Sequence, residues 1–474
     1  MRSKWRKYVL LLAAALCGAY TGGMSRGVFA QESAQTQEMS KSETEDLKWR
    51  LKQMEEAVLR QQEQIQAIRN RLEPVGPEVT KVAKEEIEQA IDDYLSTDEA
   101  RKKMGLGLPS LTAVYTPDDD KYSLSIKSPD SNYSFNLGGR MQFRYTYKDN
   151  DENFPKTSGS DKQDIALRRA RLYMGGNIYS KYVHYYVELD ADKFTFGMRD
   201  FYVYWTPIGD DLNFKLGYFK VPFNRQRMVT SGKLLFQDRS IANDAFTQDR
   251  DYGLDIYGKV LGEDNKVEYH AAVFQGAGQD PTKLAGGDNL DNKLLYVLSL
   301  RYNPFGAYDY YTDETDVKYS KKLKATIGAS VAYGAKDKDV KLLNTDTIAG
   351  VVDMGVKYRG LSWNTEYFER TEDQNGGGKN KKANGFYTQA GYFVIPKKLE
   401  VAARYSMVDP DKDVAGDIQK EYTCGLNYYF RDHRSKIQAD FGDFVTSSNN
   451  PAIKDVSGVD MKEKRIRLQY QIMF

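Results

Sequence analysis

The sequence predicts an all-β fold, namely a 16-stranded antiparallel transmembrane β-barrel preceded by a short N-terminal α-helical coiled coil. Three observations predict it. The 474 residues include 35 Tyr and 21 Phe, yet the mean hydropathy is −0.65, so the aromatic residues are interspersed with polar ones. Apolar and polar residues alternate with a period of two from residue 133 onward, as they do along strands with two different faces. The chain ends in an alternating stretch whose last residue is Phe474.

The composition excludes several other classes of protein. A bundle of transmembrane helices would need about 20 apolar residues for each helix, which a chain of this polarity does not supply. Two cysteines cannot form the framework of a disulfide-rich domain. The formal net charge of +1 gives no support for a nucleic-acid partner. Many short strands with one apolar face are the remaining solution.

Residues 1–30 have the pattern of a secretory signal peptide. Four basic residues precede the apolar run 9–16, and Ala30 offers a small residue for cleavage before Gln31. The apolar run is far shorter than the stretch that spans a bilayer, so a membrane anchor is the weaker interpretation. Cleavage leaves Cys424 as the only cysteine of the mature chain, which therefore has no intrachain disulfide.

Residues 40–73 are predicted to form a coiled coil that ends at Pro74. Apolar residues, with one glutamine among them, recur at alternating spacings of four and three, the repeat of a heptad seam. Such a helix has no core of its own and should oligomerise, the alternative being a solvated helix. Residues 74–110 are predicted as a helical linker, and 111–132 as a connecting segment. The seam consists of Leu47, Leu51, Met54, Val58, Gln61, Ile65, Ile68 and Leu72.

The barrel is predicted to occupy residues 133–474. Sixteen stretches have the alternation of a strand, and an even number is what bacterial barrels have. The strands are expected at 133–147, 166–179, 182–193, 196–205, 212–221, 250–261, 265–278, 292–304, 322–335, 349–359, 361–372, 384–395, 398–408, 417–431, 434–446 and 461–474.

The connections between these strands provide an independent check. Barrels of this kind have long loops at one end and short turns at the other. The odd-numbered connections are mostly long and the even-numbered ones mostly short, and the longest is 222–249. Two connections depart from the pattern, because 305–321 is long where a short turn is expected and 194–195 is short where a loop is expected.

The C-terminal strand carries the most specific signal. Ile466, Leu468, Tyr470, Ile472 and Phe474 lie on one face of it. A final aromatic residue with this alternation is typical of the signal that the outer-membrane assembly machinery reads, whereas a soluble edge strand would end this way only by chance. Together with the signal peptide, it predicts a barrel in contact with outer-membrane lipid and a coiled coil in the periplasm.

Several segments, in order along the chain, carry a family resemblance. They are Ser128–Arg140, Leu167–Leu172, Gly217–Phe223, Phe236–Ser240, Arg250–Gly253, Gly360–Glu366 and Leu399–Ser406. Each is weak alone, but their order resembles that of the phosphate-selective porin O/P family over residues 128–474. The resemblance implies a trimeric sixteen-stranded barrel that passes anions and needs no cofactor. The predicted coiled coil fits a homotrimer.

The same resemblance implies that the third odd-numbered connection, 222–249, folds inward and narrows the channel. We expect six inward arginines on three neighbouring strands to form a basic wall, because arginine stays charged and offers forked donors to an oxyanion. The expected wall is Arg140, Arg144, Arg169, Arg171, Arg465 and Arg467, faced by Glu188 and Asp190. The expected constriction residues are Arg225, Arg227, Lys233, Asp238, Arg239 and Asp244.

These features predict an outer-membrane porin for passive diffusion of small hydrophilic solutes and ions, with a modest preference for anions such as phosphate. A non-selective porin, whose coiled coil acts as a stalk or contacts peptidoglycan, is the alternative. Weak or cation selectivity stays open because inner-face carboxylates are numerous. An enzyme is disfavoured, since the three histidines, at 184, 270 and 433, suggest no catalytic residue or metal site. The inner-face carboxylates are Asp200, Asp255, Glu268, Asp353, Glu366, Glu400 and Glu421.

Overall fold

The structure is a computed structural model of the whole chain. It describes residues 111–115, 122–151, 162–192, 196–260, 266–276, 294–308, 313–334, 345–374, 380–447 and 460–474. The predicted signal peptide, coiled coil and helical linker lie outside the described residues. Among the described residues, no helix has the length and apolar character needed to cross a membrane.

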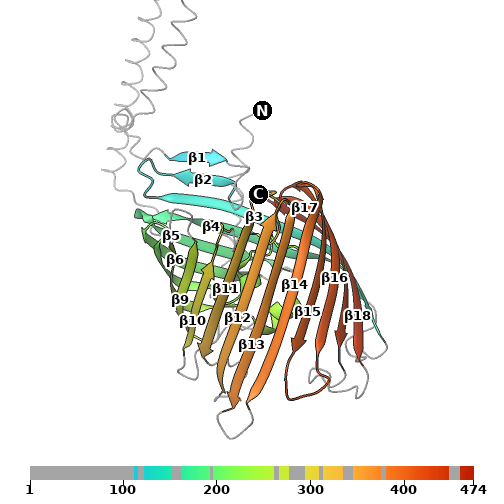
Figure 1. Cartoon of the computed structure of the whole chain (residues 1–474). Coiled ribbons are helices and arrows are strands. Elements are labelled where there is room, and N and C mark those ends of the chain that lie inside the picture. Colours follow the sequence, from blue (N-terminus) through green and yellow to red (C-terminus); the bar gives the residue numbers. More distant parts are fainter. Residues whose placement is uncertain are drawn as a thin grey trace, which may run out of the picture. The chain divides into compact units, whose positions relative to one another are not determined.

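Sixteen antiparallel strands close into a barrel (Figure 1). Each predicted strand is confirmed in the predicted order, and no strand end differs by more than four residues. The strands are β3 (Ser134–Asn150), β4 (Lys162–Ile178), β5 (Ser180–Asp190), β6 (Gly197–Ile208), β7 (Leu212–Lys220), β8 (Arg250–Val260), β9 (Val267–Phe274), β10 (Leu295–Tyr302), β11 (Lys324–Gly334), β12 (Thr345–Tyr358), β13 (Leu361–Gln374), β14 (Lys381–Ile395), β15 (Leu399–Asp409), β16 (Gln419–Arg431), β17 (Ser435–Thr446) and β18 (Met461–Met473).

The barrel closes where its last strand pairs with its first. Residues of β18 from Glu463 to Met473 pair with β3. Phe474 continues this pairing: the Gly139 N–H donates to its main-chain oxygen over 2.6 Å, and its own N–H donates to the Gly139 oxygen over 3.0 Å. The Phe474 ring lies directly on Gly139, where a Cβ would collide with it. The aromatic C-terminus is therefore part of the closing seam.

Two short strands precede the barrel. β1 (Thr112–Tyr115) pairs with β2 (Leu124–Lys127), and β2 pairs with residues 134–137 of β3, which extend beyond the end of β18. This ribbon lies at the end of the barrel that carries the short turns (Figure 1). The predicted connecting segment 111–132 thus contains two strands that lengthen one wall without joining the closed ring.

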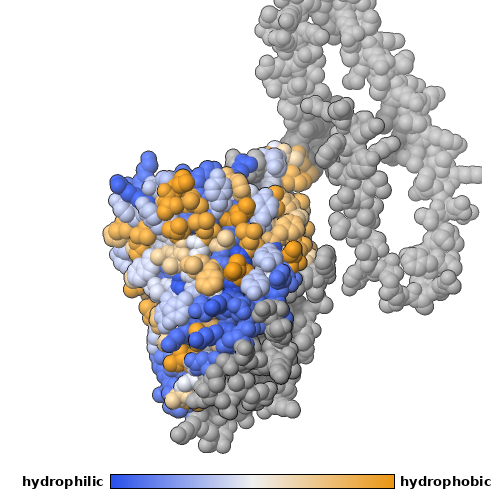
Figure 2. All heavy atoms as spheres, turned by 90° about the vertical axis from the view of Figure 1, so that its right-hand side faces the viewer, coloured by the Kyte–Doolittle hydropathy of each residue, from blue (hydrophilic) through white to orange (hydrophobic). Residues whose placement is uncertain are grey.

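The two faces of the strands differ as the alternation predicts. On β18, Ile466, Leu468 and Tyr470 are exposed on the outside, whereas Arg467 and Gln469 are buried toward the lumen. Figure 2 shows apolar residues gathered toward the upper part of the visible wall and hydrophilic ones below them. An apolar exterior around a polar interior is the arrangement of a barrel in lipid.

The two ends of the barrel carry connections of different lengths. At the short-turn end, β12 and β13 are joined by Arg359 and Gly360 alone, both with positive φ (47° and 85°), as a two-residue hairpin requires. At the long-loop end, residues 221–249, here called the constriction loop, join β7 to β8. The connection 303–323 joins β10 to β11 at the short-turn end and is long, as the sequence indicates. Both segments contain buried residues and enter the lumen.

Candidate functional site

The constriction loop is held across the lumen by a short capped helix and by apolar contacts with the wall. The helix, α7 (Ile241–Phe246), is the second of the loop, and it begins at Ser240, whose side chain accepts a hydrogen bond from the Asn243 N–H over 3.1 Å. Phe246 at the end of α7 stacks on Phe368 of β13, with ring centroids 5.4 Å apart and planes 8° from parallel. Phe236 packs in a buried cluster with Leu235 and Ala402. These contacts fix the path of the loop.

Asp238 is the electrostatic anchor of the constriction loop. Its carboxylate accepts hydrogen bonds from Arg144 at 2.6 Å, Arg467 at 2.7 Å and Arg169 at 3.1 Å. Its main-chain oxygen accepts two more from Arg404 at 3.1 Å. Burial would raise the pKa of Asp238, but the guanidinium groups of Arg144, Arg467 and Arg169 hold it well below its ordinary value. Asp238 is therefore ionised and draws the loop onto the arginine-bearing wall.

The six arginines of the predicted wall lie on β18, β3 and β4, but only three of them meet at Asp238. Arg140 is fully buried and donates to Ser231 of the constriction loop at 2.8 Å. Arg171 donates to Glu188 at 2.7 Å and lies 3.4 Å from Asp190. The half-buried Arg465 pairs with Glu463 and lies over the ring of Phe444. Much of the wall thus holds the loop or neighbouring carboxylates.

Two further arginines reach the lumen because each sits at a β-bulge. In β4 the register shifts between Arg169 and Leu167, and in β6 between Asp200 and Met198. The extra residues are Arg168 and Arg199, which strict alternation would place on the outer face. A bulge re-aims such a side chain. Their side chains are 34% and 22% exposed, more than those of the arginines at Asp238.

The bulge arginines form looser ion pairs than the arginines at Asp238. Arg168 lies 3.6 Å from Asp192 and 3.8 Å from Asp238, and Arg199 lies 3.5 Å from Asp190. Alternation alone misses both residues. The sequence did contain a signal for them. Arg168-Arg169 and Arg199-Asp200 are pairs of adjacent charged residues, and strict alternation would place one member of each pair on the lipid face, where a charge is costly.

The predicted charged residues of the constriction loop have different surroundings. In the first helix, α6 (Arg225–Met228), Arg225 contacts Asn364 on β13, while Arg227 pairs with Asp249. Arg239 donates to main-chain oxygens of the same loop, Gln226 at 2.8 Å and Val229 at 2.6 Å. Burial lowers the pKa of Arg239 to about 10, so it remains charged at neutral pH. Lys233 is buried and Asp244 is exposed.

Two adjoining cavities lie between the constriction loop and the arginine-bearing wall. The larger, about 650 Å³, lies toward the long-loop end and includes Lys148 and Lys162. The smaller, about 390 Å³, is the basic passage. Among the described residues it is lined by eight arginines and four carboxylates, together with Ile241 and Phe444. The charged residues are Arg168, Arg169, Arg171, Arg199, Arg227, Arg239, Arg465, Arg467, Asp192, Asp238, Asp244 and Glu421.

The 303–323 connection meets the constriction loop from the opposite end. The Glu314 carboxylate accepts hydrogen bonds from the Leu235 N–H at 2.8 Å and from the Gln226 side chain at 3.1 Å. The Glu314 N–H donates to the Lys233 oxygen at 3.1 Å. The unexpected length of this connection is explained, because it must reach into the lumen to make these contacts.

The residues on either side of Glu314 in the 303–323 connection bind the barrel wall. Asp313 accepts hydrogen bonds from the Thr315 side chain at 2.9 Å and lies 3.0 Å from His433 Nε2, while Lys357 donates to the Asp313 main-chain oxygen at 2.9 Å. Burial would raise the pKa of Asp313, but His433 and Lys357 hold it below its ordinary value. Asp316 accepts the Gly360 N–H at 2.7 Å. The connection is thus fastened to the wall beside the short turns.

The histidines occupy three separate places. His184 stacks on Tyr204, His270 lies 3.0 Å from Asp255, and His433 binds Asp313. Within the described ranges, no group of three or more His, Cys, Asp and Glu could hold a metal ion.

Comparisons with known proteins address the family and the fold. The profile of the family described as phosphate-selective porin O and P matches residues 135–472. No curated protein sequence matches. The anion-selective porin from Comamonas acidovorans is similar, with a TM-score of 0.50 and 15% identity over 72% of this chain and 99% of that one. The outer membrane channel DcaP of Acinetobacter baumannii has a TM-score of 0.48 and 12% identity, over 73% of this chain and 99% of that one. OmpT of Vibrio cholerae has a TM-score of 0.45 and 11% identity, over 71% of this chain and 98% of that one.

Proposed function

The chain belongs to the phosphate-selective porin O and P family, and from this premise we propose that it passes small hydrophilic solutes and ions by passive diffusion, with a preference for anions. The family and the barrel support a channel in the outer membrane. The single observation that carries the anion preference is the basic passage, where eight arginines face four carboxylates among the described residues.

The orientation follows from the lengths of the connections. Barrels of this class place short turns in the periplasm and long loops outside the cell. The constriction loop then enters from the extracellular side, and the 303–323 connection enters from the periplasmic side. The signal peptide at 1–30, the periplasmic coiled coil and a homotrimer remain part of the proposal. The basic and apolar pattern of residues 1–30 supports the first, and the heptad seam at 47–72 supports the coiled coil and its association into an oligomer.

The charges of the passage are arranged so that they do not cancel. Arg144, Arg169 and Arg467 donate to Asp238 and also to Gln469, Gln142 and Asp440, so most of their N–H groups already have partners. Arg168 and Arg199 make only looser ion pairs, so their N–H groups can meet a passing oxyanion. A narrow passage with low-dielectric walls strengthens such a field. Anions should therefore cross more readily than cations.

Ion selectivity in planar bilayers tests this proposal. Under a KCl gradient we expect the reversal potential of an anion-preferring channel. Replacing both bulge arginines, Arg168→Gln with Arg199→Gln, should reduce the anion preference. The matched control is Lys464→Gln, which removes one positive charge from the exposed outer face of β18 and should change nothing. A cation-selective reversal of the unmodified channel would overturn the proposal.

A further inference from the structure

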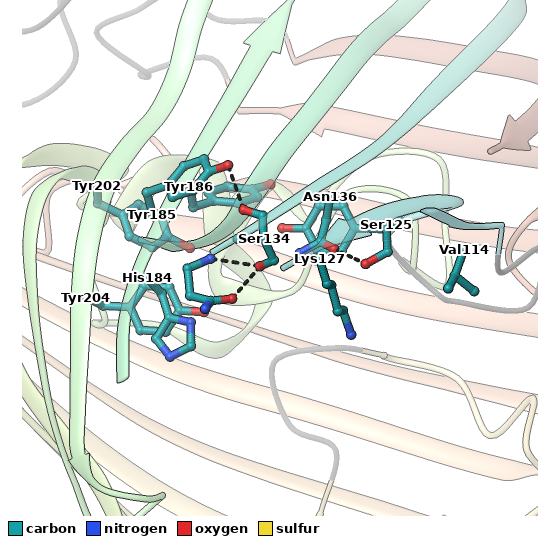
Figure 3. A pocket seen from close by; sticks show the side chains of 13 residues that line it. Val114, Ser125, Lys127, Ser134, Asn136, His184, Tyr185, Tyr186, Tyr202 and Tyr204 are labelled. Carbon is teal, nitrogen blue, oxygen red and sulfur yellow. Dashed lines mark hydrogen bonds between the residues drawn. The ribbon is translucent and has the colours of Figure 1, made fainter. Parts of the chain in front are cut away.

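A separate cavity lies at the short-turn end, away from the basic passage. Its volume is about 410 Å³, within the range of small-molecule sites. Tyr186, Tyr202 and Tyr204 line it from the inner faces of β5 and β6, while Lys127 and Asn136 approach from β2 and β3 (Figure 3). Aromatic side chains thus stand on one side and polar ones on the other.

The aromatic side forms a continuous surface. His184 stacks on Tyr204 with centroids 4.6 Å apart and planes 14° from parallel. Tyr202 lies 5.1 Å from Tyr186 and 6.0 Å from Tyr204. Water is a poor neighbour for such faces, because exposed apolar area is unfavourable. Rings gathered at this point of a largely polar lumen therefore point to a solute with an apolar face.

The cavity is shaped by two glycines of β4, the strand between its two sides. A Cβ at Gly176 would collide with the main-chain oxygen of Ser134, and one at Gly175 would meet the Tyr122 hydroxyl. The Tyr185 hydroxyl crosses over this strand and donates to the same Ser134 oxygen at 3.1 Å. The missing side chains thus let β3 and β5 approach across β4, which gives the cavity a defined floor.

Polar groups are placed around the rim of the cavity. The Asn136 carbonyl oxygen accepts the Ser125 hydroxyl at 2.6 Å, which fixes the orientation of its amide. Lys127 is exposed. Within the described part of the chain, the hydroxyls of Tyr202 and Tyr204 make no hydrogen bond to protein. Amide, ammonium and phenol groups are therefore available next to the aromatic faces.

We propose that this cavity binds a carbohydrate ring. Sugars combine a face of C–H groups, which packs on an aromatic ring, with hydroxyls at the edge that hydrogen-bond to amide and phenol groups. A flat aromatic solute would use the rings but would leave the polar rim unpaired. The cavity volume suits one or two sugar rings.

Two hydrogen bonds to Glu188 link the site to the basic passage. The Tyr186 hydroxyl donates to Glu188 at 3.1 Å, and Glu188 accepts from Arg171, which lines that passage. A solute that leaves the arginines therefore meets the aromatic surface next. The inference rests on the proposed channel only for the route by which the sugar arrives, since binding itself requires no conduction.

Saturation-transfer difference NMR of the full chain in detergent tests the site, with maltose as the probe and benzoate as the flat aromatic alternative. Maltose should bind, and Tyr204→Ala and Tyr202→Ala should each weaken it about tenfold. Tyr204→Phe should retain most of the affinity, because the ring remains, and Lys127→Ala tests the rim at an exposed position where folding is not at stake. Arg168→Gln is the matched control and should leave maltose binding unchanged.

Three results would overturn the proposal: no transfer to maltose, maltose binding that survives both tyrosine substitutions combined, or binding of benzoate in preference to maltose. Bilayer selectivity of the same preparation keeps the two proposals apart. An anion-selective channel without maltose binding defeats the sugar site alone, whereas maltose binding by a cation-selective channel defeats only the anion preference.

Discussion

The two carboxylates that fix the constriction loop face different partners. Asp238, in the loop itself, is surrounded by arginines of the wall. Glu314, in the 303–323 connection, binds a main-chain N–H and a neutral amide of the loop, while its neighbour Asp313 fastens the connection to His433 on the wall. Both carboxylates accept charge-assisted hydrogen bonds, but the guanidinium groups at Asp238 add the attraction of opposite charges, which the neutral donors at Glu314 do not supply. The ion pairs of Asp238 therefore stabilise the constriction loop more strongly, whereas the hydrogen bonds of Glu314 fix the position of the loop main chain at Leu235.

The largest effect is expected from Asp238→Asn. The substitution leaves three buried arginines without their shared anion, and breaking a buried ion pair costs about 3–5 kcal/mol. We expect a mobile constriction loop, seen in single-channel recordings as fluctuating conductance, and a stronger anion preference because a negative charge is lost. Asp244→Asn removes another negative charge of the same passage without touching the arginines at Asp238, so it should raise the anion preference while the conductance stays steady. A steady conductance in the Asp238 variant would show that charge is not the main anchor.

A smaller effect is expected from Glu314→Ala. The change leaves the Leu235 N–H without its partner, a loss of about 1–3 kcal/mol for a buried group. Hydrogen exchange of the loop amides, followed by mass spectrometry, should show faster exchange around Leu235. Glu314→Gln keeps one acceptor oxygen and should lie between the variant and the unmodified chain. Equal exchange in all three proteins would mean that the 303–323 connection does not position the loop.

The pH offers a milder way to change the charge of the basic passage. Burial and the neighbouring Asp190 raise the pKa of Asp192, in the loop after β5, to about 6. Asp192 is thus negative above pH 6 and neutral below it, so the anion preference should increase as the pH falls from 7.5 to 5. Asp192→Asn should show the low-pH preference throughout. The reversal potential should be measured at low ionic strength, where screening is weak. A pH dependence of the anion preference that persists in Asp192→Asn would mean that a group other than Asp192 titrates.

The smallest effect is expected from Ser240→Ala, which removes the cap of α7. Losing an N-cap costs about 1 kcal/mol. Stacking of Phe246 on Phe368 still holds the far end of this helix, so the conductance should stay unchanged while amide exchange in α7 rises slightly. Ser240→Thr retains the cap and serves as the comparison. A change of conductance as large as that of Asp238→Asn would place the anchor of the loop here instead.

The sequence could predict the barrel because apolar and polar side chains alternate along every strand. It could also predict that arginines of β3, β4 and β18 share a wall, since closure makes these strands neighbours. It could not predict that Arg168 and Arg199 turn inward, because a bulge is defined by the pairing of two strands and not by one strand alone. The inward path of 303–323 was visible only as an excess of length. Its partner, the main chain at Leu235, carries no sequence signal at all.

The closing seam also completes the electrostatic anchor of the constriction loop. Arg144 lies on the first strand of the ring, and Arg467 lies near the end of the last one. Pairing between elements so distant in sequence is slow compared with local hairpin formation. Until β18 meets β3, Asp238 has Arg144 and Arg169 but lacks Arg467. The last strand therefore both closes the wall and supplies the third arginine that holds the loop.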